Sequence, residues 1–212
     1  MQKTSSKDVK RQSTKLRICK YAVNMFYKNG TKNVKMDDIS SKLKISKRTL
    51  YELYDDKEQL LLECMKFKAE AEKEELHDFV TNKASNVMEV LLKFYEIRMD
   101  IIKKVSPAFY ADLERYPSVL KFLKHQSALE HSRSIQFFSK GVEDGFFREG
   151  INYEIITYMS EAYMGYIMQN KLYDKFSMKD LFTNFVSVIV RGYCTEKGIA
   201  ILKSFSVKDK EH

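Results

Sequence analysis

The chain has 212 residues, 44% of them apolar, and only 7 glycines and 2 prolines. This length supplies one large domain or two small ones, and the scarcity of turn residues favours helices over strands joined by tight turns. No apolar run approaches the roughly 20 residues that span a bilayer, and the polar start MQKTSSKDVKRQSTK does not predict a secretory signal. We therefore expect a helical, cytoplasmic protein without a membrane partner.

Positive charge is concentrated near the N-terminus. The formal net charge is +8, and residues 1–57 hold 15 Lys plus Arg against 6 Asp plus Glu, whereas the remaining 155 residues hold 22 against 23. This asymmetry predicts a small module that binds a polyanion, next to a nearly neutral body with a different task.

The spacing of the cysteines and the lack of catalytic motifs argue against several other classes of protein. Cys19, Cys64 and Cys194 are widely spaced and odd in number, which favours neither a disulfide framework nor a zinc site. Buried structural cysteines are the simpler interpretation, and a reactive thiol sensor is the alternative. The sequence contains no HExxH, Gly-rich phosphate loop or GxSxG pattern, so we expect no catalysis, no metal site and no cofactor.

The first quarter of the chain predicts four helices. Residues 1–12 lack apolar periodicity and are expected to form a disordered basic arm. Apolar residues then recur at helical spacing from about residue 13 to Asn29, where Gly30 can close the helix in the left-handed conformation. Two short helices are expected from about Met36 and from Lys47 to about Leu53, and a longer one follows to about residue 78.

Capping residues support two of these helix starts. Ser46 is a good N-cap for the third helix, and Asp56 with Gln59 matches the capping box that opens the fourth. Leu50 and Leu53 of the third helix are expected to point inward.

The rest of the chain also has helical periodicity. The segment GVEDGFFREG is its clearest loop, and residues 206–212 are expected to be a tail. The predicted helices cover residues 87–101, a short segment from Pro107, a further helix from Pro117, and the ranges Asn152–Leu172 and Met178–Lys197.

Two short helices joined by a tight turn and supported by a longer helix are typical of a helix-turn-helix unit. The second short helix of such a unit enters the major groove of DNA. In this chain that helix starts with the cationic pair Lys47 and Arg48, while Leu50 would anchor it. Tyr51 and Tyr54 could contact phosphates through their phenols. The amino end of the fourth helix could bind another phosphate through its backbone donors.

Residues 18–63, ICKYAVNMFYKNGTKNVKMDDISSKLKISKRTLYELYDDKEQLLLE, resemble the DNA-binding domain of the TetR family of transcriptional regulators. Lys35 and Lys44 depart from the family pattern, which has a Thr cap and a turn Gly at these positions. A positive φ at Lys44 would cost about 1 kcal/mol of strain. The matching elements are Ala22, Phe26, Gly30, Asp38-Ile39, Ile45-Ser46, Thr49-Leu50-Tyr51, Tyr54 and Lys57-Glu58-Leu60.

The resemblance and the helix-turn-helix geometry together predict the residues that contact double-stranded DNA. They are Lys35, Met36, Lys44, Ser46, Lys47, Arg48, Thr49, Tyr51, Tyr54 and Lys57.

By analogy with the family, the last two long helices would form a four-helix homodimer interface. A dimer would set two recognition helices about 34–36 Å apart, as a palindromic operator requires. The predicted interface residues are Ile155, Met159, Ile167, Phe182, Phe185, Ile189 and Tyr193.

The resemblance also implies a pocket for a small apolar or aromatic ligand among the middle helices. The same side chains would equally serve as plain core. The candidates are Phe94, Tyr95, Met99, Phe109, Tyr110, Phe122, Phe137, Phe138, Tyr163 and Met164.

The sequence thus predicts an all-α protein: an N-terminal three-helix helix-turn-helix DNA-binding domain at residues 13–60, then a larger helical ligand-binding and dimerisation domain at 79–205, with about nine helices. The function we expect is a ligand-responsive, dimeric transcriptional repressor. The alternatives are a non-specific DNA-binding helical protein without a ligand, and a helical enzyme using His125, His131 or the scattered acids.

Overall fold

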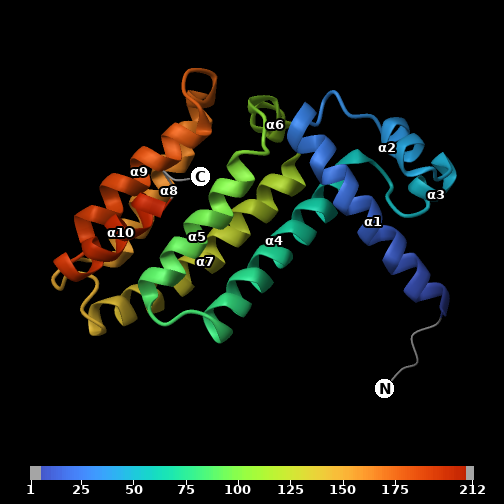
Figure 1. Cartoon of the computed structure of the whole chain (residues 1–212). Helices are drawn as coiled ribbons and strands as arrows, with labels where there is room; N and C mark the ends of the chain where they lie inside the picture. Colours follow the sequence, from blue (N-terminus) through green and yellow to red (C-terminus); the bar gives the residue numbers. More distant parts are fainter. Residues whose placement is uncertain (1–5, 209–212) are drawn as a thin grey trace. The chain divides into compact units, whose positions relative to one another are not determined.

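The computed structural model describes residues 6–208, with side-chain surroundings for residues 8–203. This part of the chain contains no β-strand, which agrees with the predicted all-α class. Its elements, labelled in Figure 1, are α1 (Ser6–Asn29), α2 (Met36–Leu43), α3 (Lys47–Tyr51), α4 (Lys57–Asn82), α5 (Val87–Ile102), α6 (Pro107–Asp112), η1 (Leu113–Arg115), α7 (Pro117–Glu143), α8 (Tyr153–Gln169), η2 (Leu172–Asp174), α9 (Met178–Tyr193) and α10 (Glu196–Lys208).

These helices pack as two compact units. The head comprises Met1–Glu74 and Lys104–Leu123, and the body comprises Glu75–Lys103 and Lys124–His212. The predicted domains were continuous in sequence, whereas each of these two units combines two separate segments of the chain. The segment Lys104–Leu123, which the sequence assigned to the ligand-binding domain, packs with the head.

The head has a core drawn from its first four helices. α1 packs on α2 and on α6, and α2 packs on α3. Gly30 ends α1 with φ +76°, and its amide donates to the Phe26 carbonyl at 2.9 Å, as the sequence predicted. The side chains of these four helices that have no exposed surface are Ile18, Ala22, Phe26, Ile39, Leu50, Leu60, Leu61 and Cys64.

The start of α1 differs from the prediction. Residues 6–12 are helical rather than a disordered arm, although the described side chains among them are exposed. Helix growth is cooperative, so a helix anchored at Ile18 can extend through exposed residues of good helix propensity. Asp8 in the first turn also opposes the positive end of the helix dipole. Residues 1–5 lie outside the described part of the chain.

The segment with α6 is tied to the head by specific contacts. The Ser106 amide donates to the Tyr27 carbonyl at 2.8 Å, and the rings of Tyr27 and Phe109 meet edge to face at 4.9 Å. The Lys32 amide donates to a carboxylate oxygen of Asp112 at 2.7 Å. These contacts explain why this segment belongs to the head.

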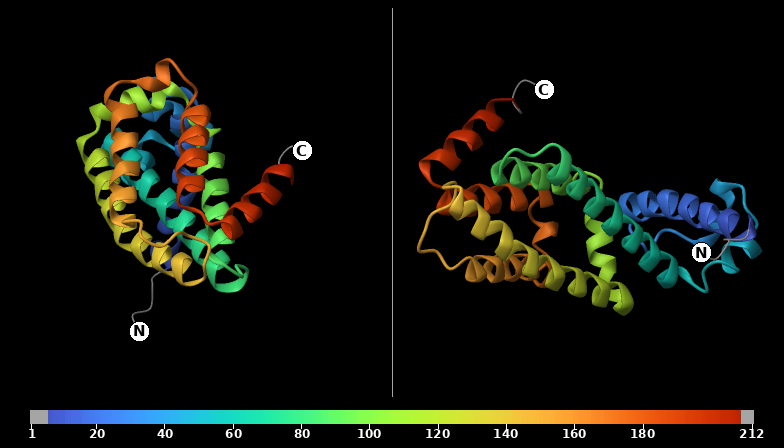
Figure 2. Two further views of the ribbon diagram at one scale, coloured as in Figure 1. Left: turned by 90° about the vertical axis from the view of Figure 1, so that its left-hand side faces the viewer. Right: turned by 90° about the horizontal axis from the view of Figure 1, so that it is seen from below.

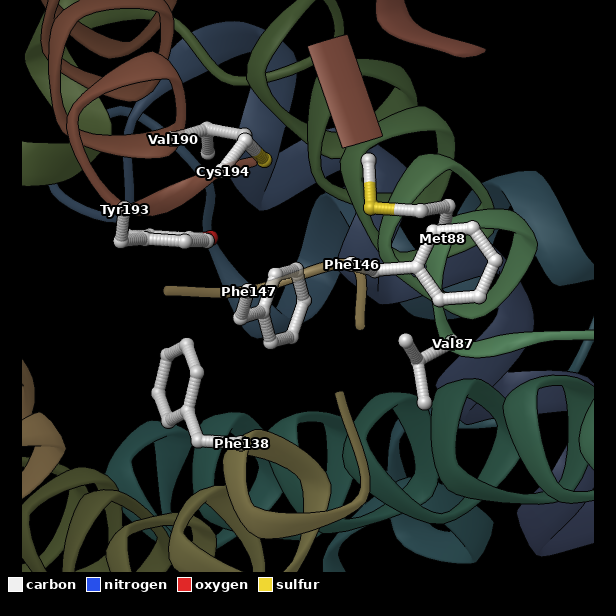
Figure 3. Close-up of a cluster of buried hydrophobic side chains, with 8 residues drawn as sticks. All are labelled: Val87, Met88, Phe138, Phe146, Phe147, Val190, Tyr193 and Cys194. Atoms are coloured by element: carbon white, nitrogen blue, oxygen red, sulfur yellow. The ribbon is translucent and has the colours of Figure 1, made fainter. Parts of the chain in front are cut away.

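The body is built around an aromatic cluster, shown in Figure 3. Phe146 and Phe147 lie in the predicted loop GVEDGFFREG, yet both are buried. The Arg148 amide donates to the Tyr193 carbonyl at 2.8 Å, which holds this segment against the end of α9. The loop is therefore part of the core. The buried members of the cluster are Val87, Met88, Phe138, Phe146, Phe147, Val190, Tyr193 and Cys194.

The C-terminal helices also differ from their predicted bounds. Cys194 adopts an extended conformation, with φ −74° and ψ 143°, so α9 ends at Tyr193 rather than near Lys197. α10 follows as a separate helix that packs on α5 and turns away from α9 (Figure 2). Residues 206–208, predicted as tail, are helical, and 209–212 lie outside the described residues.

Gly141 allows α7 to approach Phe147, and this contact can be tested. A Cβ at position 141 would lie 1.9 Å from a ring carbon of Phe147, so Gly141→Ala must displace a buried ring. We expect a net loss of about 1–2 kcal/mol in unfolding free energy, because overpacking outweighs the gain in helix propensity. Urea unfolding measures this loss. Ser139→Ala, at an exposed position of the same helix, is the control, and a more stable Gly141→Ala would contradict the packing.

Candidate nucleic-acid interface

The turn between α2 and α3 has the conformation that a helix-turn-helix requires. Lys44 adopts φ +53°, so it takes the left-handed conformation at the position where the TetR pattern has Gly. The Ile45 amide donates to the Ser40 carbonyl at 3.1 Å. The Ser46 hydroxyl oxygen then accepts from the Thr49 amide at 2.9 Å, so the predicted N-cap of α3 is confirmed.

Burial on one side of α3 leaves its other side exposed. Leu50 has no exposed surface, while the side chains of Lys47 and Arg48 are 65% and 88% exposed. Tyr51 is 49% exposed. Cations and a phenol therefore lie together on the open face of a short, anchored helix. This set can donate to base edges and phosphates.

Each cation of α3 has an acidic neighbour in the free protein. Lys47 Nζ lies 2.5 Å from a carboxylate oxygen of Asp37, and Arg48 Nε lies 2.8 Å from one of Glu52. The hydrogen bond to each carboxylate raises the pKa of its cation. Exposed pairs of this kind are weak and readily exchanged for other anions, so they hold the side chains without blocking the face.

Two of the predicted DNA-contacting residues are buried in the head instead. Tyr54 is 1% exposed, and its phenol donates to the Lys15 carbonyl and lies 3.4 Å from the sulfur of Cys19. Met36 is 7% exposed and packs at the start of α2. Both assignments came from the resemblance and the helix-turn-helix geometry, whereas contacts with α1 hold the Tyr54 side chain inside.

Lys57, predicted as a DNA contact, also lies in a different environment. Its ammonium donates to the carbonyls of Thr31 at 2.9 Å and Val34 at 3.1 Å, so it closes the loop between α1 and α2. At the same helix end, Asp56 accepts from the Gln59 amide at 2.8 Å, and the Gln59 side chain accepts from the Asp55 amide at 2.6 Å. The amino end of α4 is thus capped by its own side chains.

Lys35 remains exposed at the start of α2. Its backbone amide donates to a carboxylate oxygen of Asp38 at 2.9 Å, which satisfies one donor of this helix end. A lysine side chain has no acceptor for the reciprocal bond, so the cap is half of a capping box. The expected loss of the Thr-type cap is confirmed, and the ammonium stays exposed.

The first turns of α1 contribute residues that the sequence analysis missed. They border a surface hollow of about 370 Å³ next to α3. Arg11 lies at its edge, with Nη2 donating to the Glu52 carbonyl at 3.5 Å. Only the continuation of α1 brings these residues beside α3, and no local sequence signal marks it. The hollow is lined by Lys10, Arg11, Thr14, Thr49, Glu52 and Leu53.

The predicted ligand-contacting residues are divided between the two units. Phe109, Tyr110 and Phe122 belong to the head, where Phe109 packs on Tyr27. The other seven belong to the body, and among them Phe138 lies in the buried cluster. Phe94 and Met164 are partly open, with 36% and 39% of their surfaces exposed.

Aromatic stacking joins α5, α8 and α9 within the body. Tyr95 stacks on Phe182 with ring centroids 5.6 Å apart, and Tyr163 stacks on Phe185 at 4.2 Å. The Tyr163 phenol donates to the Leu181 carbonyl at 3.0 Å. These four predicted residues therefore form two stacked pairs.

The predicted dimer residues separate into an exposed set and a buried set. Ile155 and Met159 on α8 are 54% and 48% exposed. Phe182, Phe185 and Ile189 on α9 are half-buried. Ile167 and Tyr193 are only 1% and 4% exposed. Because neighbouring helices of the same body cover them, Ile167 and Tyr193 serve as core in this chain.

The described residues show neither a metal-binding cluster nor a membrane-spanning helix. Residues 8–203 contain no group of three His, Cys, Asp or Glu side chains placed to hold a metal ion. None of the described helices is long and apolar enough to cross a membrane.

The geometry of the head is that of a helix-turn-helix DNA-binding domain. Residues 18–64 match the family model described as bacterial regulatory proteins, tetR family. Twelve chains of solved structures match this chain, whereas no curated protein is significantly similar to it. Residues 18–64 are therefore similar to the DNA-binding domain of TetR-family regulators, as the resemblance implied, and the described residues share the fold of the matched structures.

Three solved structures illustrate this fold. A transcriptional regulator from Saccharomonospora viridis in complex with choline has a TM-score of 0.68 at 16% identity, covering 87% of this chain and all of that one. A TetR-family regulator from Cytophaga hutchinsonii has 0.65 at 15%, covering 92% and 100%. A gamma-butyrolactone receptor, described as ArpA-like, has 0.64 at 14%, covering 96% and 100%.

The position of Lys57 generates a prediction about stability. Lys57→Met keeps the apolar stem but removes the donor for two carbonyls, and Thr31 and Val34 are themselves buried. We expect the head to lose about 1–3 kcal/mol of unfolding free energy, because buried acceptors are left without a partner. Urea unfolding with a probe in the head measures it. Lys42→Met, at an exposed position of α2, is the control, and equal stability of the two variants would contradict the assigned role.

Proposed function

We propose that this chain is a homodimeric, sequence-specific DNA-binding transcriptional regulator. The observation that carries the proposal is α3, whose exposed face presents Lys47, Arg48 and Tyr51 while Leu50 anchors it. The match of residues 18–64 to the TetR family supports the same role. Since its proposed partner is chromosomal DNA, we assign the protein to the cytoplasm.

Lys47, Arg48 and Thr49 are proposed to read base edges in the major groove. Ser46, Lys44, Lys35 and Tyr51 would contact the phosphates beside them. The basic first turns of α1, with Lys10 and Arg11, would add positive charge close to the same phosphates. The excess charge of +9 within residues 1–57 supports phosphate binding by the head.

The homodimer is proposed to form through α8 and α9. Ile155, Tyr158, Met159 and Tyr166 are 54%, 55%, 48% and 57% exposed and recur at helical spacing on α8. Val188 on α9 is 71% exposed. Exposed apolar side chains that recur along one helix in this way favour an interaction site. Two-fold symmetry would then match the two halves of a palindromic operator.

We further propose that a small apolar or aromatic ligand binds the body and releases the protein from its operator, as expected for a repressor. The stacked aromatic pairs of α5, α8 and α9 support an aromatic binding surface. Relatives of this fold bind choline and a gamma-butyrolactone, so the fold accommodates chemically different ligands. Release follows if the ligand favours a dimer geometry that no longer fits two half-sites.

Substitutions in α3 test sequence-specific binding. Duplexes are first selected from a randomised library with the wild-type protein. Lys47→Ala and Arg48→Ala should each weaken binding to the selected duplex by about 5- to 150-fold and relax base preference, because a base contact is lost. Lys66→Ala is the matched control, since Lys66 is another exposed lysine of the head that pairs with an acid, Glu63. Unchanged affinity and preference in both α3 variants would refute the assignment.

A second pair of variants tests the dimer. Met159→Glu places a charge on the exposed stripe of α8 and should convert the dimer to a monomer, because the charge would be buried without a partner. Phe176→Glu is the control, because Phe176 is equally exposed, at 48%, but lies outside α8 and α9. Sedimentation velocity measures both. A Met159→Glu variant that stays dimeric would place the interface elsewhere.

A further inference from the structure

Two cysteines and a tyrosine from three parts of the chain meet inside the head. Cys19 lies on α1, Cys64 on α4, and Tyr54 follows the end of α3. The sulfur of Cys19 is 3.4 Å from the Tyr54 phenol oxygen, and the Cys64 thiol lies close enough to lower the pKa of Cys19. Cys19, Cys64 and Tyr54 are 5%, 0% and 1% exposed. The DNA-reading unit therefore contains a buried pair of adjacent thiols.

The two thiols have different acidities. Hydrogen bonds from Cys64 and Tyr54 lower the pKa of Cys19 to about 7, although burial opposes this shift. Its hydrogen bond to Cys19, together with burial, raises the pKa of Cys64. By contrast, burial raises the pKa of Cys194, the cysteine of the body, to about 11. At neutral pH one member of the pair is thus partly a thiolate, which is the nucleophilic form of a cysteine.

We propose that Cys19 and Cys64 are a peroxide-sensitive dithiol whose oxidation to a disulfide weakens DNA binding. The effect on DNA rests on the function proposed above, whereas disulfide formation does not. The proximity of the two thiols, the contact of Cys19 with Tyr54 and the backbone bond from Tyr54 to Leu50 of α3 carry the inference. The third cysteine, Cys194, packs in the aromatic cluster of the body as a buried structural residue.

The reaction requires hydrogen peroxide and two successive displacements at sulfur. The Cys19 thiolate attacks one peroxide oxygen, the O–O bond breaks, and the released hydroxide takes up a proton to form water. Cys19 is then a sulfenic acid. The Cys64 sulfur attacks the Cys19 sulfur, the S–O bond breaks, and the departing oxygen leaves with the Cys64 proton as the second water. Two thiols and one peroxide give one disulfide and two waters.

Formation of the Cys19–Cys64 disulfide would change the position of α3 through Tyr54. A disulfide brings its sulfurs to about 2.05 Å, closer than any hydrogen-bonded pair, so α1 and α4 must adjust. The sulfur of Cys19 would then move relative to the phenol of Tyr54. The Tyr54 amide donates to the Leu50 carbonyl at 3.0 Å, so Tyr54 is tied directly to the anchor of α3. A shift of Tyr54 therefore displaces the helix that carries Lys47 and Arg48.

The test treats the full-length protein with hydrogen peroxide and measures two quantities independently. Mass spectrometry should find the loss of two hydrogen atoms and a cross-linked peptide pair containing Cys19 and Cys64. Affinity for the duplex selected from the randomised library should fall by about 5- to 150-fold and recover with dithiothreitol. Cys194→Ser should respond like the wild type, whereas Cys64→Ser should keep its affinity after brief peroxide treatment.

The pH dependence and one further variant separate a reactive pair from a merely structural one. The rate of disulfide formation should rise as the pH increases through about 7, since the thiolate of Cys19 is the nucleophile. Tyr54→Phe removes one hydrogen bond that stabilises this thiolate and should move the midpoint to higher pH. Because this rate is measured by mass, it does not require DNA binding.

The outcomes distinguish this inference from the proposed function. A cross-link with unchanged DNA affinity would overturn the inference alone, and so would oxidation without a Cys19–Cys64 cross-link. If the reduced wild type bound no DNA in the selection, the proposed function would fail, and the claimed effect on DNA with it. The cross-link measurement would still decide whether the thiols form a reactive pair.

Discussion

The DNA-facing surface depends on the burial of Leu50. α3 has five residues, and a helix of this length does not persist in water by itself. Its N-cap, Ser46, satisfies one backbone donor, and Leu50 fixes the helix on the core formed with α1 and α2. The cations can point outward only because this one side chain points inward. Most of the head serves to provide that buried position.

Locally determined features could be predicted from the sequence. Ser46 caps its helix as expected, because an N-cap bond joins residues three apart in the chain. The helix end at Gly30 follows from the backbone freedom of glycine, whereas the positive φ at Lys44 follows from its place at the glycine position of the TetR pattern. The pattern that revealed the TetR resemblance is likewise contained in one short segment, residues 18–63.

Features that depend on distant partners could not be predicted. Lys57 has the charge expected of a phosphate contact, but its ammonium donates to carbonyls of the loop between α1 and α2. Tyr54 is buried, because its phenol contacts the sulfur of Cys19 and donates to the Lys15 carbonyl on α1. Tyr193 has the same apolar character as Met159, yet the segment containing Phe147 covers it. Sequence spacing specifies the face of a helix, whereas the packing of other elements decides whether that face is open.

The segment Lys104–Leu123 gives the head a covalent link to the proposed ligand-binding helices. It is held to α1 by the Ser106 amide and to α4 by Glu58, which accepts from the Ser118 amide at 2.9 Å. It continues directly into α5 at one end and along α7 at the other.

The most direct test is binding of the purified protein to DNA flanking its own gene, compared with shuffled DNA over a salt series. The account predicts about a thousandfold preference for the flanking DNA, with a salt dependence equivalent to several phosphate contacts. Salt-sensitive binding without preference would indicate a non-specific DNA-binding protein. Absence of binding at every salt concentration would contradict the role assigned to α3.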